Sequence, residues 1–224
     1  MKKTIVSGVK RILPKFLLNK IRLWKYGKNK DIPLQDIFSG IYEQKVWGGE
    51  EAKTTDFHSG GGSLANVTEK YEKFIVEFVS DNQIGAIVDL GCGDFQVGQR
   101  ILSKTDCKYI GVDVVPSLIK RNNKLFSSEN IEFFSKNIAD DELPSGELCL
   151  IREVLQHLDN NNIIKVLKNV SKYKYVLISE SVSKEVSEYN LDIPAGHWTR
   201  SLLGSGVFIE KPPFSVQAIN VLEY

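Results

Sequence analysis

The stretch IVDLGCGDF, residues 87–95, decides the fold of this chain. Its apolar start leads into a turn that contains Gly91 and Gly93, and a helical pattern follows the turn. Glycine lets the backbone approach a ligand closely, and the start of the next helix offers unpaired N–H groups. The stretch therefore predicts a strand, a ligand-binding turn and a helix in immediate succession.

The same alternation of strand and helix continues on both sides of this stretch. Short apolar runs predict strands at residues 84–90, 109–112, 131–134, 148–151 and 175–178, and helical patterns lie between them at 96–102, 116–126 and 163–170. Apolar runs separated by helices are typical of parallel strands that are buried on both faces. We therefore expect an α/β fold with a Rossmann-like, doubly wound, mostly parallel sheet. The remaining residues predict a short C-terminal antiparallel pair of strands at 207–209 and 216–222.

Composition and patterning divide the chain into three parts. Residues 1–30 form a basic amphipathic segment, residues 31–63 an irregular, glycine-rich lid or loop region, and residues 64–224 the main domain. A helix is expected from residue 64 onward, with Ser63 as its cap.

The charge of the chain is unevenly distributed. The first 30 residues hold ten of the 29 Lys and Arg residues and no acid, which leaves 19 basic against 28 acidic residues in the rest. Such an acidic body is a poor partner for nucleic acid. The basic segment is compatible with two arrangements, an interfacial anchor on an anionic membrane or a helix packed on the domain with a solvated charged face.

The overall composition is that of a globular protein. The chain has 224 residues, of which 42% are hydrophobic and 25% charged, and this suits one domain with an appendage. Three cysteines without paired spacing favour a reducing compartment, and no apolar run reaches the ~18–20 residues of a membrane span. We expect a cytoplasmic protein, with peripheral contact at the inner face of the membrane as one alternative. The oligomeric state stays open.

An acid at the end of the second predicted strand narrows the choice of ligand. Asp113 follows Gly93 by twenty residues, a position from which a carboxylate accepts hydrogen bonds from ribose hydroxyls. A dinucleotide fingerprint requires a third glycine at position 96, where this chain has Gln96. An acid before the turn, here Asp89, is instead typical of class I S-adenosylmethionine-dependent methyltransferases. The chain resembles that family from residue 84 to about residue 179.

This resemblance implies S-adenosylmethionine as the cofactor. The residues that it assigns to cofactor binding are Asp89, Gly91, Gly93, Asp113, Val114, Asn137, Ile138, Arg152, Ser59 and Ser63. The chain departs from the family at two positions. Phe95 replaces the third glycine of the acid-x-G-x-G-x-G pattern, and Glu72 follows Tyr71 where members often carry an arginine.

A narrower resemblance is carried by several strings together. They are SGGGS at 59–63, CGDF at 92–95, YIGVDVVPSLI at 109–119, LPSGELCLIREVLQHL at 143–158, NLDIPAGHW at 190–198 and PPF at 212–214. This set is similar to small bacterial methyltransferases associated with surface-polysaccharide and glycan assembly. It implies O-methylation of a saccharide or glycan-linked group, a SGGGS loop that closes on the cofactor, and substrate-binding residues Asn190, Asp192, His197 and Arg200.

A hydroxyl acceptor must lose a proton during methyl transfer, so a general base is needed. His157 is the first candidate because imidazole titrates near neutrality, and His197 is the second. Glu153, one helical turn from His157, could orient His157, act as the base itself or pair with Arg152. Neither the cysteines nor the acids form a pattern typical of a metal site, so no metal is assigned.

Three other functions stay open at this stage. The chain could methylate a small metabolite or a lipid, or it could be a non-catalytic module that binds the cofactor and a partner. A nicotinamide-dependent oxidoreductase is the remaining competitor, because dinucleotides use a similar glycine turn.

Overall fold

A computed structural model describes residues 32–47 and 57–224 of the chain. In chain order the elements are α3 (Leu34–Glu43), η3 (Gly61–Ser63), α4 (Ala65–Asp81), β1 (Ala86–Leu90), α5 (Gln96–Leu102), β2 (Lys108–Asp113), α6 (Pro116–Phe126), β3 (Ile131–Ser135), β4 (Leu148–Arg152), η4 (Leu155–His157), α7 (Asn160–Val170), β5 (Tyr175–Ser179) and η5 (Arg200–Leu203), where η denotes a 3-10 helix. The alternation predicted on both sides of the glycine turn is confirmed, within two or three residues at each boundary.

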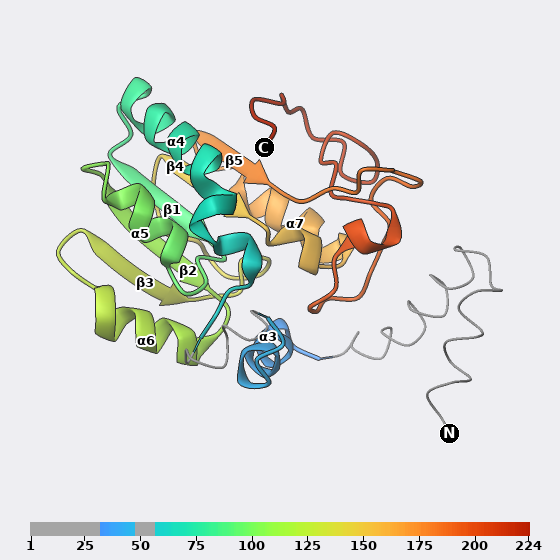
Figure 1. Cartoon of the computed structure of the whole chain (residues 1–224), viewed down its shortest axis with the longest axis horizontal. Coiled ribbons are helices and arrows are strands. Elements are labelled where there is room, and N and C mark those ends of the chain that lie inside the picture. Colours follow the sequence, from blue (N-terminus) through green and yellow to red (C-terminus); the bar gives the residue numbers. More distant parts are fainter. Residues whose placement is uncertain (1–31, 48–56) are drawn as a thin grey trace.

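The five strands form one parallel sheet in the order β3-β2-β1-β4-β5 (Figure 1). The chain moves outward from β1 to β2 and β3, and then crosses to β4 on the other side of β1. In open α/β sheets ligands bind beyond the carboxyl ends of the strands, where the strand order reverses. The Rossmann-like prediction is confirmed, and the topology puts the glycine turn after β1 at this point.

Apolar layers cover both faces of the sheet. On one face Ile75 of α4 and Ile101 of α5 share a core cluster with Ile87 of β1. On the other face Phe38 of α3 and Ile163 of α7 share a cluster with Val88, the next residue of β1. Successive side chains of a strand point to opposite faces, so the unbroken apolar run of β1 serves both layers.

Two predictions near the start of the domain need correction. The region expected to be irregular contains the helix α3, whose buried face is made by Phe38, Ile41 and Tyr42. Ser63 does not cap a helix with its side chain, because it lies inside η3 and Leu64 occupies the N-cap position of α4.

The predicted C-terminal antiparallel pair is wrong. In the described chain after β5, η5 is the single regular element, and residues 207–209 and 216–222 form no strand. Val216 donates one backbone hydrogen bond to the carbonyl of Ile209, which is too little to build a ladder.

The basic segment 1–30 lies outside the described residues, as does the part of the lid region at 48–56. Among the helices of residues 32–47 and 57–224, none has the length and apolar character needed to cross a bilayer.

Candidate functional site

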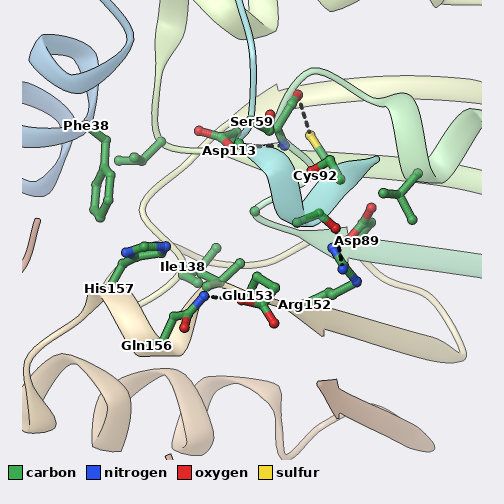
Figure 2. Close-up of a pocket in the computed structure, with 18 of the residues that line it drawn as sticks. Phe38, Ser59, Asp89, Cys92, Asp113, Ile138, Arg152, Glu153, Gln156 and His157 are labelled. Carbon is green, nitrogen blue, oxygen red and sulfur yellow. Dashed lines mark hydrogen bonds between the residues drawn. The ribbon is translucent and has the colours of Figure 1, made fainter. Parts of the chain in front are cut away.

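A cavity of about 310 Å³ lies beyond the carboxyl ends of the strands (Figure 2). All ten residues predicted to bind the cofactor line it, together with Glu153, His157 and His197. In Figure 2, Arg152 and Asp89 lie close together on one side of this cavity, and His157 lies toward Phe38 on the other. We call these two sides the Arg152 end and the His157 end.

The turn after β1 is built so that only glycine fits. Gly91 and Gly93 have positive φ angles of 81° and 55°. A Cβ atom on Gly91 would lie 2.3 Å from Cγ2 of Val154, and one on Gly93 would lie 2.3 Å from Oγ of Ser59. The two glycines therefore allow the loop after β4 and the segment 57–63 to pack directly against the turn.

Phe95 occupies the position of the family's third glycine and adopts the left-handed conformation, with φ 71°. A left-handed conformation is costly for a bulky residue. Its ring is 1% exposed and packs on the rings of Tyr109, Phe126 and Phe133. Burial of this ring stabilises a turn shape that glycine would otherwise provide.

Asp113 is tied to the glycine turn. Its carboxylate accepts hydrogen bonds from the backbone N–H of Gly93 (3.2 Å) and of Val115 (3.1 Å). Burial raises the pKa of Asp113 to about 6, and the backbone N–H groups oppose this shift. The carboxylate is thus fixed at the end of β2, facing the cavity.

Asp89 lies at the Arg152 end. Its Oδ2 accepts a hydrogen bond of 2.5 Å from the hydroxyl of Tyr109. Burial raises the pKa of Asp89 to about 6, while the Tyr109 hydrogen bond and the charge of Arg152 act in the opposite direction. No ion pair joins Asp89 and Arg152 among the described contacts, so the two charges are neighbours with room between them.

The segment 57–63 is attached to the glycine turn by reciprocal hydrogen bonds. The backbone N–H of Ser59 donates to the carboxylate of Asp94 (3.3 Å), and the backbone N–H of Asp94 donates to Oγ of Ser59 (2.8 Å). The Ser59 hydroxyl also bonds with that of Tyr42 in α3 (3.0 Å). The segment thus covers the turn.

Two of the residues predicted to bind the cofactor, Asn137 and Ile138, differ in role. The amide of Asn137 is engaged within its own loop, where it accepts the N–H of Ala139 (3.0 Å) and donates to Asp140 (3.0 Å). Ile138 presents a buried apolar side chain to the cavity. An aromatic base would contact Ile138 rather than the side-chain amide of Asn137.

The loop after β4 is held by a half-buried acid that sequence reasoning did not identify. The carboxylate of Glu180 accepts the backbone N–H groups of Val154 (3.0 Å), Leu155 (2.7 Å) and Gln156 (3.1 Å). Burial, and then the charge of Glu153, raise the pKa of Glu180 to about 8, against the effect of these N–H groups. The sequence signal that could have identified Glu180 is its position as an acid just after the strand predicted at 175–178.

His157 is oriented by backbone carbonyls. Its Nδ1 lies 3.1 Å from the carbonyl oxygen of Gly196 and 3.2 Å from that of Trp198, so Nδ1 carries the proton and Nε2 is left with a lone pair. Burial lowers the pKa of His157 to about 4. The ring packs against Trp47, with centroids 5.2 Å apart.

Glu153 does not orient His157 in this structure. Its carboxylate accepts a hydrogen bond from the Ser181 hydroxyl (2.8 Å) and another from the amide of Gln156. Glu153 has a positive φ of 56°, a strained conformation of the kind that clusters at functional sites. Its side chain lies between the two ends of the cavity in Figure 2.

Aromatic residues form much of the wall at the His157 end. Phe38 and Tyr42 come from α3, and Trp47 follows it. The rings of Tyr42 and Trp47 meet edge to face, with centroids 5.3 Å apart. Sequence reasoning missed this wall because it treated the region as irregular, although Leu34, Phe38 and Ile41 follow helical spacing.

The structure separates the four predicted substrate residues. His197 lines the cavity, but Arg200 is fully buried and donates to the carbonyls of Leu191, Leu155 and Leu158. Asn190 is 3% exposed and donates to the carbonyls of Phe208, Lys211 and Pro212. Asp192 lies in a neighbouring groove and accepts the N–H of Asn160 (2.8 Å). Asn190 and Arg200 therefore fix the fold around the cavity without lining it.

Glu72 has a structural partner. Its carboxylate bonds with the guanidinium of Arg100 (2.7 Å) and the hydroxyl of Thr68 (2.5 Å), and the residue is 4% exposed. The charge at this position therefore faces α5 rather than a ligand.

Within residues 32–47 and 57–224, no group of three or more His, Cys, Asp or Glu residues is arranged to hold a metal ion.

Part of the chain matches a known protein family. Residues 87–173 match the family described as "Methyltransferase domain", and the match runs from the start of the glycine stretch through α7. No curated protein matches the sequence.

Solved structures share the fold at low sequence identity. The N-methyltransferase NodS from Bradyrhizobium japonicum, solved with S-adenosylhomocysteine, is 14% identical with a TM-score of 0.50, over 66% of this chain and 74% of that chain. Human N-acetylserotonin methyltransferase, solved with S-adenosylmethionine, is 19% identical with a TM-score of 0.44, over 71% of this chain and 45% of that chain. The match thus spans less than half of the human enzyme.

Proposed function

We propose, from the premise that residues 87–173 form a methyltransferase domain of the class I, S-adenosylmethionine-dependent type, that this chain methylates a hydroxyl of a saccharide or glycan-linked group. The observation that carries the proposal is the single cavity that joins the glycine turn to the His157 end. A methyl donor held by the turn and an acceptor held beside His157 would share that cavity.

The residues present fit S-adenosylmethionine. Gly91 and Gly93 line the cavity, where a ligand can approach the backbone of the turn, and Asp113 can accept the ribose hydroxyls. The Arg152 end offers an acid and a cation, Asp89 and Arg152, to the α-ammonium and α-carboxylate of the methionine part. When bound, the cofactor supplies a methyl group on a sulfonium, which an oxygen nucleophile can attack in line.

The protein's part in such a reaction is positioning and proton removal. A cavity walled in part by the segment 57–63 would hold the two reactants together, and such positioning can supply much of the catalysis. Nε2 of His157 would accept the hydroxyl proton, because Nδ1 already donates to the carbonyls of Gly196 and Trp198. With a pKa of about 4 the ring is neutral at neutral pH and its Nε2 lone pair is available, but the same shift makes it a weaker base than an exposed imidazole.

The aromatic wall supports a saccharide as the acceptor. Sugar rings present C–H faces that pack on aromatic side chains, and their hydroxyls need polar partners at the edges. Phe38 and Trp47 provide the first kind of surface, and Glu153 and His197 provide the second.

The first experiment is calorimetric titration of the full chain with S-adenosylmethionine, S-adenosylhomocysteine and NADH. We expect the first two ligands to bind and NADH not to bind, and Asp113→Ala to weaken binding of both. A labelled methyl donor would then identify acceptors in a panel of saccharides, with matched small metabolites and lipids as competitors. Binding of NADH alone would overturn the proposal that the chain is a methyltransferase. Methyl labelling of only a metabolite or a lipid would overturn the proposal that the acceptor is a saccharide.

We also propose that residues 1–30 bring the enzyme to an anionic membrane surface at its cytoplasmic face, where glycan precursors are assembled. The support is the charge of this segment, ten basic residues with no acid. Sedimentation with vesicles of anionic or neutral lipid tests the proposal. The full chain should bind the anionic vesicles, and a chain that begins at Asp31 should not; equal binding of the two chains would contradict it.

A further inference from the structure

The guanidinium of Arg152 is a cation in the cavity that forms no ion pair with an acid of residues 32–47 or 57–224. Among the described residues no carboxylate lies within ion-pair distance of it. It is held by neutral groups from distant parts of the chain. Nη2 donates to the carbonyl of Gly62 (2.6 Å), Nε donates to the hydroxyl of Tyr224 (3.3 Å), and the guanidinium lies 5.4 Å from the ring centre of Tyr71.

These partners fix the direction of the side chain while leaving its charge unneutralised. Arginine presents five N–H donors in a planar fork that matches a carboxylate. Two of its nitrogen atoms, Nε and Nη2, have protein partners, which leaves donors on the fork for a ligand. In the neighbouring acid Asp89, it is Oδ2 that accepts the hydrogen bond from Tyr109.

Tyr224 joins the ends of two strands at this place. Arg152 and Ser179 are register partners at the carboxyl ends of β4 and β5. The Tyr224 hydroxyl accepts from Nε of Arg152 and bonds with Oγ of Ser179 (2.6 Å), and its ring packs on Tyr71 (5.9 Å). The tail 216–224 has no regular structure and lies near β5 and α4 in Figure 1, so Tyr224 attaches its end to the domain.

We propose that Tyr224 is a positioning residue for the cofactor: its hydroxyl holds the Arg152 guanidinium in the orientation that receives the α-carboxylate of S-adenosylmethionine. The C-terminal tail is then part of the cofactor site, although it lies far along the chain from the glycine turn. This inference rests on the proposed function, because it takes the ligand at the Arg152 end to be an amino-acid group.

A pair of ligands tests this role separately from folding. S-adenosylhomocysteine carries the amino-acid part, and 5′-methylthioadenosine carries the same adenosine and sulfur without it. In calorimetric titrations of the full chain, Tyr224→Phe should weaken S-adenosylhomocysteine about 3- to 10-fold, and Arg152→Met should weaken it more than tenfold. Neither variant should change the affinity for 5′-methylthioadenosine. The matched control is Tyr189→Phe, which removes a hydroxyl from an exposed tyrosine that does not line the cavity.

The outcomes separate the two proposals. Unchanged affinity of Tyr224→Phe for S-adenosylhomocysteine would overturn the positioning role, as would an equal loss of affinity for both ligands, because that pattern indicates a general disturbance of the fold. If the unmodified chain bound neither ligand, the methyltransferase function itself would fail, and this inference with it.

Discussion

The carboxylate of Glu180 accepts the backbone N–H of Leu155 at 2.7 Å, and the same carboxylate takes the N–H groups on either side. One half-buried side chain after β5 thus holds residues 154–156 of the loop that follows β4. That loop carries Glu153 and His157 into the cavity. The geometry of the proposed reaction therefore depends on a residue that does not line the cavity.

Glu180→Ala should destabilise the chain by roughly 2–4 kcal/mol, because three backbone N–H groups lose their acceptor in a partly buried place. Urea unfolding measures this change. Glu147→Ala is the matched control, since Glu147 accepts a single N–H, from Gly85, in an exposed contact, and should cost less than about 1 kcal/mol. Equal costs for the two variants would contradict the role given to Glu180.

The titration of His157 should take place near pH 4. Burial favours the neutral ring, and we expect its Cε1–H resonance to move with a midpoint of about 4 in an NMR titration. Between pH 4 and 6.5 the unfolded chain holds a proton on this histidine that the folded chain does not. The unfolding free energy of the natural chain relative to His157→Gln should therefore rise with pH by at most about 3 kcal/mol, and level off above 6.5. A midpoint near 6.5 would be inconsistent with a buried ring.

Binding of S-adenosylhomocysteine should strengthen as the pH rises through about 6. Asp113 and Asp89 both have pKa values raised to about 6 by burial, and the ionised carboxylates are the forms that accept hydrogen bonds from a ligand. Asp113→Asn should weaken binding about tenfold at pH 8 and reduce its pH dependence between 5 and 8 to the part that Asp89 supplies. Asp106→Asn, a change in an exposed acid outside the cavity, serves as the control. A pH dependence that Asp113→Asn leaves unchanged would exclude Asp113 as its source.

Gly93→Ala should cost about 1–3 kcal/mol of stability, because the left-handed backbone disfavours a side chain and the new Cβ would press on Ser59. Ser59→Gly in the same chain should recover part of this loss, which a double-mutant cycle of unfolding free energies measures. Gly61→Ala, where a Cβ meets nothing within 4 Å, should change stability by less than about 0.5 kcal/mol. Strict additivity of the Gly93 and Ser59 changes would mean that the two residues do not touch.

The sheet and its helices were predictable from the sequence because each strand is a short apolar run and the intervening helices are locally patterned. The position of Gly91 and Asp113 side by side in the cavity wall was predictable for the same reason, since they lie at the ends of adjacent strands; their role in cofactor binding stays a prediction. The His157 end of the cavity was harder to predict. His157 takes its orientation from Gly196 and Trp198, about 40 residues away, and no local pattern encodes such a contact.

Polar residues near the C-terminus were misjudged because polarity does not reveal burial. Arg200 and Asn190 look like ligand-binding residues in the sequence, yet each satisfies several backbone carbonyls inside the fold. The apolar residues of 216–222 imitate a strand. The structure ties this tail down by the hydroxyl of Tyr224, not by a ladder of backbone hydrogen bonds.

Phe95 links the ligand turn to the interior of the protein. Its ring is packed among Tyr109, Phe126 and Phe133, and Tyr109 in turn bonds to Asp89. A turn anchored in this way cannot open without disturbing the aromatic cluster beneath it. The packing of the core therefore supports the shape of the cavity. A conservative change deep in the core, such as Phe133→Leu, should lower the affinity for a ligand in that cavity.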